Sequence, residues 1–171
     1  MNDVAARSQH TIGDRVYDAI FIGGIGGGLV ALFFLVFDMV TGRQALFTPS
    51  LMGRVLFDRV SAGTVESVSL AAVAKFSALH LAAFGLLGFG ISYLTHQAEL
   101  RARHPILVIA LVFATLEVAF WVGASVAIPG VLDRLGLVPV AAANLVAAVG
   151  VGLFLVTTHR RDLMGRRRPK G

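Results

Sequence analysis

The sequence contains no cysteine, and this absence excludes several kinds of site at once. Without a thiol, the chain forms no disulfide, offers no thiolate nucleophile and holds no Cys-ligated zinc or iron–sulfur cluster. Histidine is also scarce, with five residues in 171. Any metal or haem site would have to be built from these histidines and from ten acidic residues.

Charge is the second thing the chain has little of. Only 15% of its residues are Asp, Glu, Lys or Arg, whereas 56% are hydrophobic, and the mean hydropathy is +0.79. Soluble domains carry about 25% charged residues. The surface of this chain is therefore too apolar for water, and a lipid bilayer is the solvent that its composition predicts.

The net charge of +5 comes from the C-terminal end, residues 159–171. The basic residues there are Arg160, Arg161, Arg166, Arg167, Arg168 and Lys170, against the single acid Asp162. A basic tail that follows an apolar segment is a topology signal and a contact for anionic lipid head groups. Nucleic-acid binding is not expected, because no recognition module accompanies the tail.

Four segments are long and apolar enough to cross a bilayer as helices: about 17–40, 68–97, 105–128 and 135–158. Since backbone groups in hydrocarbon must be satisfied within the segment, each is expected to be an α-helix of about 20 residues or more. The first is longer than a signal-peptide core and has no convincing cleavage site, so we expect it to be retained. The fold class predicted is an all-α bundle of four transmembrane helices in a single membrane domain.

The distribution of Lys and Arg predicts how the chain is threaded. Ten basic residues lie in the leader (Arg7, Arg15), the second loop (Arg101, Arg103) and the six-residue set of the tail. Four lie on the other side: Arg43, Arg54, Arg59 and Arg134. Because positive loops stay inside, both termini are expected in the cytoplasm.

The first external loop contains a second kind of helical pattern. Thr48 and Pro49 have the order of an N-cap and a first turn, and apolar residues then recur at helical spacing, namely Leu51, Met52, Val55, Leu56 and Val60. Two interpretations stay open: a short amphipathic helix on the outer membrane surface, or a loop packed across the mouth of the bundle.

Glycines in the first span predict close helix packing. Gly23 and Gly27 are four residues apart, as are Gly24 and Gly28, and this spacing lets a second backbone approach. A phosphate-binding loop is not expected, because the run lies inside an apolar helix. On a helical wheel the expected contact face holds Gly24, Gly27, Gly28, Ala31, Leu35 and Asp38.

Two ionisable residues lie deep in the spans. Counting from opposite ends of antiparallel helices places His80 and Glu117 at about 15 Å depth, so a contact between them is predicted. The pair is either a proton-handling or ligand site, or a structural hydrogen bond. Trp121 shares the face of Glu117. Asn144 in the fourth span either extends this network or, as the preferred interpretation, bonds a neighbouring backbone.

A second polar pair is predicted near the outer ends of the first two spans, where Asp38 and Lys75 would form a structural ion pair. No cofactor or metal is expected. A b-type haem needs two axial ligands at one depth, but only His80 is deep. His96 and His104 flank a short loop that lacks further ligands.

Several stretches resemble a family of small bacterial four-helix membrane proteins with no assigned activity. They are residues 37–53, which include Asp38 and the Leu46-to-Gly53 run, then residues 79–85 around His80, Leu116 with Glu117, and residues 144–148 from Asn144. The resemblance implies the four-helix fold and a shared core of Asp38, His80, Glu117 and Asn144.

The function predicted is that of a structural or accessory subunit of a membrane complex, or of a homo-oligomer. The alternative is a small oligomeric transporter or channel that uses His80 and Glu117. An enzyme is less well supported, because one histidine and one glutamate do not define a site. The excess of Arg over Lys, with abundant Ala, Gly and Val, suggests a bacterial inner membrane.

Overall fold

The computed structural model describes residues 12–97, 105–128 and 130–165, and in these ranges the only regular elements are helices. Four are long: α1 (Ile12–Val40), α3 (Leu70–Gln97), α5 (Pro105–Ala127) and α7 (Leu137–Gly165). Two short helices, α2 (Phe47–Phe57) and α6 (Val131–Leu135), and a 3-10 turn, η1 (Ala62–Thr64), join them. The all-α prediction agrees with this architecture.

Each long helix contains a stretch that is long and apolar enough to cross a membrane. These stretches are Val16–Val40, Leu70–Leu94, Ile106–Ala127 and Leu137–Thr158. They lie within two or three residues of the ranges that hydropathy alone predicted. The chain is thus a helical bundle with four candidate membrane spans.

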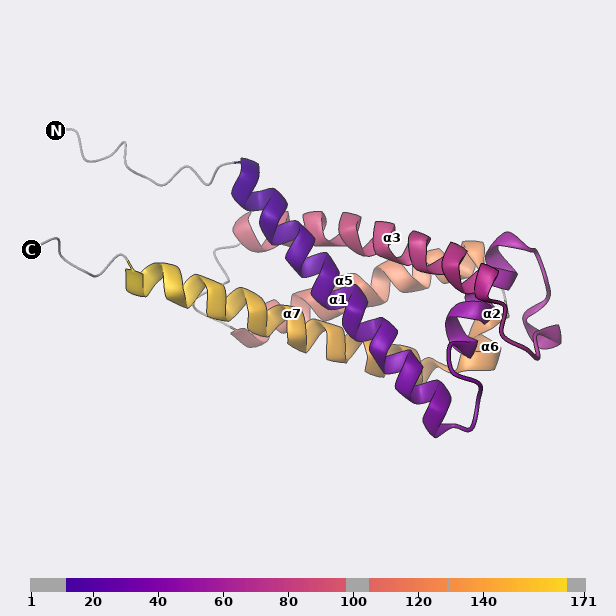
Figure 1. Cartoon of the computed structure of the whole chain (residues 1–171). Coiled ribbons are helices and arrows are strands. Elements are labelled where there is room, and N and C mark those ends of the chain that lie inside the picture. Colours follow the sequence, from indigo (N-terminus) through magenta and orange to yellow (C-terminus); the bar gives the residue numbers. More distant parts are fainter. Residues whose placement is uncertain (1–11, 98–104, 129, 166–171) are drawn as a thin grey trace, which may run out of the picture.

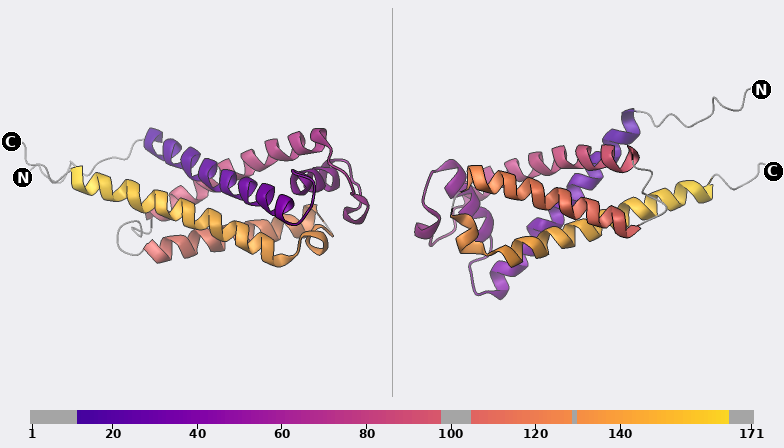
Figure 2. Two further views of the ribbon diagram at one scale, coloured as in Figure 1. Left: turned by 60° about the horizontal axis from the view of Figure 1, so that its bottom comes forward. Right: turned by 180° about the vertical axis from the view of Figure 1, so that it is seen from behind.

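The long helices run as an antiparallel bundle, with the start of α1 and the end of α7 at one end (Figure 1). The short elements α2, η1 and α6 gather at the opposite end, which we call the capped end (Figures 1 and 2). Around the bundle, α1 packs against both α3 and α7, and α5 packs against α7, whereas α3 and α5 barely touch. Helices that follow each other in sequence are therefore not all neighbours in space.

Glycines bring α1 and α3 together where they cross. A Cβ atom on Gly23 would lie 2.5 Å from the carbonyl oxygen of Phe84, and one on Gly88 would meet the backbone of Ala19 and Gly23. Only glycine has no Cβ, so these two positions let the two backbones touch. The crossing thereby fixes the distance between the two helices.

The capped end has its own apolar core. Buried residues of α2, Leu51, Met52 and Val55, pack with Val65 and with Val131 of α6. The turn η1 is held at both ends by Arg134, whose Nε and Nη2 donate to the carbonyl oxygens of Ala62 and Val65 at 3.1 and 2.7 Å. The apolar face of α2 is thus turned into the protein, as in the packed-loop interpretation, although the segment is helical.

Candidate functional site

His80 joins α3 to α1. Its Nε2–H donates to the carbonyl oxygen of Gly27 at 3.0 Å, and its ring lies between those of Phe76 and Phe84, one turn away on either side. The centroids are 5.8 and 4.6 Å from the imidazole. The two aromatic rings and the hydrogen bond together fix the orientation of the imidazole.

Glu117 joins α5 to α7. Its Oε1 accepts a hydrogen bond from Asn144 Nδ2 at 2.9 Å, and its Oε2 accepts one from Trp121 Nε1–H at 3.1 Å. Asn144 is buried and Trp121 is exposed, so the carboxylate lies at the edge of the α5–α7 contact. Trp121 shares the face of Glu117, as predicted, whereas Asn144 bonds the Glu117 side chain and not a neighbouring backbone, which was the preferred interpretation.

The predicted contact between His80 and Glu117 is wrong. Both side chains belong to the described residues, and each has its hydrogen bonds elsewhere, His80 with α1 and Glu117 with α7 and its own helix. The physical reason is the arrangement of the helices, because α3 packs mainly on α1 and α5 mainly on α7, so that α3 and α5 make few contacts with each other. Equal depth therefore did not mean proximity.

The predicted ion pair between Asp38 and Lys75 is also wrong. Asp38 is completely buried, and its carboxylate accepts two hydrogen bonds of 2.7 Å, from the N–H and the hydroxyl of Thr48. Lys75 Nζ lies 2.8 Å from Oδ1 of Asp58, just after α2, and both groups are exposed. The helix α2 separates the two predicted partners and supplies each with a nearer one.

Thr48 also differs from its predicted role. The helix α2 begins at Phe47, and the preceding residue, Leu46, is in the left-handed conformation (φ 67°) and provides no side-chain cap. Thr48 is therefore inside the first turn, and the acceptors for its own N–H and hydroxyl are the carboxylate oxygens of Asp38 in α1. An acidic residue at the end of one span, ten positions before a Thr-Pro pair, is the sequence signal for this contact.

Of the two glycine pairs predicted to pack in α1, one contacts α3 and the other does not. A Cβ on Gly27 would lie 3.1 Å from Phe84 and 3.5 Å from His80 Nε2, so Gly23 and Gly27 do pack on α3. Gly24 and Gly28 are exposed, and a Cβ atom added at either position would contact no neighbouring helix within 4 Å. Gly88 of α3, which the sequence did not single out, completes the crossing.

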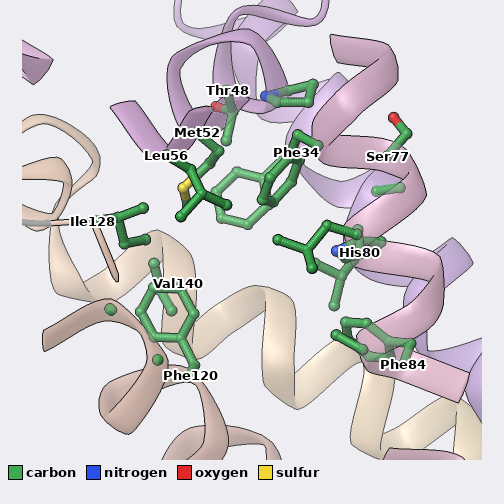
Figure 3. Close-up of a pocket in the computed structure, with 18 of the residues that line it drawn as sticks. Phe34, Thr48, Met52, Leu56, Ser77, His80, Phe84, Phe120, Ile128 and Val140 are labelled. Atoms are coloured by element: carbon green, nitrogen blue, oxygen red, sulfur yellow. The ribbon is translucent and has the colours of Figure 1, made fainter. Parts of the chain in front are cut away.

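A cavity of about 510 Å³ lies between the long helices on the bundle side of α2. Figure 3 shows Met52 and Leu56 of α2 on one side, His80 and Phe84 of α3 on another, and Phe120 and Val140 facing them. Its wall is almost entirely apolar, and the few polar side chains are Thr48, Ser77, His80 and Asn144. Ligand sites in proteins have this character, a large apolar surface with a few polar groups.

The cavity opens where α3 and α5 diverge. Among the lining residues, Ala83 and Leu86 of α3 and Gly123 of α5 are exposed, and all three lie within candidate membrane spans. In a bilayer, this opening faces lipid rather than water. A molecule dissolved in the hydrocarbon therefore has direct access to the cavity.

Within residues 12–97, 105–128 and 130–165, no group of three or more His, Asp or Glu side chains converges as metal ligands would. No protein-family model, curated protein or solved structure matches the chain. The family resemblance therefore stays a prediction, and the function has to be argued from the geometry above.

Proposed function

We propose that the chain is a multi-pass protein of the bacterial inner membrane that serves as a structural or accessory subunit of a membrane complex. The observation that carries the proposal is the exposure of α3. In the most apolar window of each span, 6% of the residues are buried in α3, compared with 50% in α7. Although α1 and α2 pack on one side of α3, the chain leaves the rest of this helix exposed, which suits a helix that binds a partner.

One face of α3 has the composition of a helix–helix contact. Ala74, Ala78 and Ala82 follow at intervals of four residues and are exposed, and Gly85 on the same side has nothing within 4 Å of a built Cβ. Small residues at this spacing let a second helix approach closely, which is how helices associate in lipid. We call Ala74, Ala78, Ala82 and Gly85 the small-residue face of α3.

The polar residues of the spans support a structural role over transport. Asp38, His80 and Glu117 each hydrogen-bond to another element of the bundle. In lipid such bonds hold helices in register at about 0.6 kcal/mol each. The transporter alternative needs a continuous polar path, but the cavity between His80 and Asn144 is mainly apolar.

The proposal includes the threading, with both termini in the cytoplasm. The charge count favours it, and the even number of candidate spans puts both ends of the bundle on one side (Figure 1). In this orientation, the basic tail meets the anionic cytoplasmic leaflet. The capped end with α2 then faces outward.

Site-specific photo-crosslinking in living cells tests the partner. A photoreactive amino acid replaces Leu81, which is 65% exposed beside the small-residue face, and in a control it replaces Leu153 of α7, which is 56% exposed. We expect one discrete protein adduct at position 81 and none at 153. An adduct of twice the chain mass identifies a homo-oligomer, and another mass identifies a different subunit.

A pair of substitutions makes this test specific. Ala78→Leu, on the small-residue face, should abolish the adduct, whereas Ala110→Leu, at an exposed position of α5, should leave it unchanged. If position 81 yields no protein adduct and the purified protein in lipid nanodiscs has the mass of one copy, the subunit proposal is wrong.

A further inference from the structure

His80 is one of the few polar side chains that line the cavity between α3 and α5. His80 Nε2 faces the carbonyl oxygen of Gly27, and a carbonyl can only accept, so Nε2 carries the hydrogen. In the neutral ring, Nδ1 then bears a lone pair. No described residue donates a hydrogen bond to Nδ1, so this nitrogen is available to a ligand in the cavity that His80 lines.

We propose that this cavity binds a small, largely apolar molecule from the bilayer that carries a hydroxyl group or a similar donor, with the donor bonded to His80 Nδ1. The class comprises long-chain and isoprenoid alcohols and related lipids. The inference does not depend on the subunit role, because it concerns the cavity wall rather than the small-residue face of α3.

The size of the cavity supports a small molecule as its occupant. Its volume of about 510 Å³ is within the range of roughly 300–1,000 Å³ that is usual for ligand sites. A transmembrane helix about 10 Å wide and 30 Å long fills roughly 2,400 Å³. A partner helix therefore cannot enter the cavity, although it can pack elsewhere on the bundle.

The position of the cavity supports entry from the lipid. Its capped end is closed by α2 through Met52 and Leu56 (Figure 3), whereas Leu86 and Gly123, two of its exposed lining residues, lie within the candidate membrane spans of α3 and α5. A molecule dissolved in hydrocarbon reaches His80 sideways without crossing water. At the depth of His80, a ligand hydroxyl has no water to which it can donate a hydrogen bond. The fixed Nδ1 of His80 offers an acceptor in place of that water.

The glycine at the opening offers a way to fill the cavity without disturbing the bundle. Gly123 lines the cavity, and a built Cβ there has nothing within 4 Å. Gly123→Leu should therefore occupy ligand space and leave the backbone in place. Gly90→Leu is the matched control, because Gly90 on α3 is equally free of neighbours and does not line the cavity.

The experiment uses the full chain, purified in mild detergent and stripped of lipid. The probe is a C16 alcohol with a diazirine in its chain, compared with its methyl ether, which lacks the donor. Crosslinked peptides are located by mass spectrometry after illumination. We expect saturable labelling of residues 76–87 and 116–127, blocked by excess hexadecanol, with the alcohol bound about three- to tenfold more tightly than the ether.

The variants test separately whether the cavity holds the ligand and whether His80 binds its hydroxyl group. Gly123→Leu should reduce labelling at least tenfold, and Gly90→Leu should not change it. His80→Phe, which keeps a ring between Phe76 and Phe84, should remove the preference for the alcohol over the ether. Circular dichroism confirms that each variant is folded.

Three results would overturn the inference. Labelling that does not saturate, or that is equal in Gly123→Leu and Gly90→Leu, would show that the cavity binds no ligand of this class. Equal binding of alcohol and ether by the unaltered chain would show that Nδ1 accepts no hydrogen bond from the ligand. None of these results affects the crosslinking test of α3, so the two proposals fail independently.

Discussion

Asp38, near the end of α1, supplies the cap of α2 through Thr48. The carboxylate is buried and accepts one hydrogen bond from the backbone N–H and one from the hydroxyl of Thr48, both 2.7 Å long. Free N–H groups in the first turn of a helix need acceptors, and here the acceptor comes from a different helix. This contact fixes α2 across the capped end, where Thr48, Met52 and Leu56 line the closed side of the cavity.

Removal of this carboxylate should destabilise the bundle. Asp38→Ala leaves two buried donors of Thr48 without acceptors, so we expect a loss of about 2–3 kcal/mol in unfolding free energy. Asp38→Asn keeps one acceptor oxygen and should lose less. The measurement is unfolding by SDS in mixed micelles, followed by circular dichroism.

The control for Asp38 is another aspartate at the same end. Asp58 pairs with Lys75 on the surface, and exposed pairs contribute at most about 1 kcal/mol, so Asp58→Ala should have a small effect. Equal losses for Asp38→Ala and Asp58→Ala would contradict the capping role of Asp38.

Two double-mutant cycles test which polar residues are coupled. Because Glu117 Oε1 accepts from Asn144, Glu117→Ala and Asn144→Ala should be non-additive by about 0.5 kcal/mol or more. Because His80 and Glu117 have separate partners, His80→Ala and Glu117→Ala should add within about 0.5 kcal/mol. A large coupling between His80 and Glu117 would mean that the bundle places them together, contrary to the structure.

Adjacent glycines of α1 offer a matched test of the crossing with α3. Gly27→Leu drives a side chain into Phe84 and His80, and overpacking of this kind costs about 1–3 kcal/mol. Gly28→Leu places the same side chain in open space and should change stability by less than about 0.5 kcal/mol. Similar unfolding curves for the two variants would show that α1 and α3 do not cross at Gly27.

The absence of cysteine makes the threading simple to test. A single cysteine replaces Glu66, which is exposed near η1, or Gly171, the last residue. A maleimide that cannot cross membranes should label Glu66→Cys in intact cells and Gly171→Cys only after permeabilisation. Labelling of Gly171→Cys in intact cells would reverse the proposed orientation.

Hydropathy identified the four long apolar helices because the requirement it measures is local. The third range was predicted as 105–128 and the candidate span is Ile106–Ala127, and the fourth was predicted as 135–158 and is Leu137–Thr158. Each segment has to satisfy its own backbone and match the bilayer thickness, whatever its neighbours are. The depth of His80 within α3 follows from the same counting.

Side-chain partners were predicted less well, because they depend on how each helix is rotated and on which helices adjoin. The glycine spacing pointed to both Gly23 with Gly27 and Gly24 with Gly28, and only the crossing with Phe84 and Gly88 distinguishes the two pairs. Asp38 and Lys75 both received other partners once α2 packed between them.

The sequence by itself determined that the chain contains four long apolar helices, and it located to within a few residues the stretches of them that are long enough to cross a membrane. The tertiary structure decided that His80 binds α1 and Glu117 binds α7, and that a cavity remains where α3 and α5 diverge. The physical reason is that apolar composition acts on each segment separately. Side-chain contacts between helices depend on which helices are neighbours and at what angle they cross. The glycine crossing of α1 with α3 and the contact of Asp38 with α2 set this arrangement.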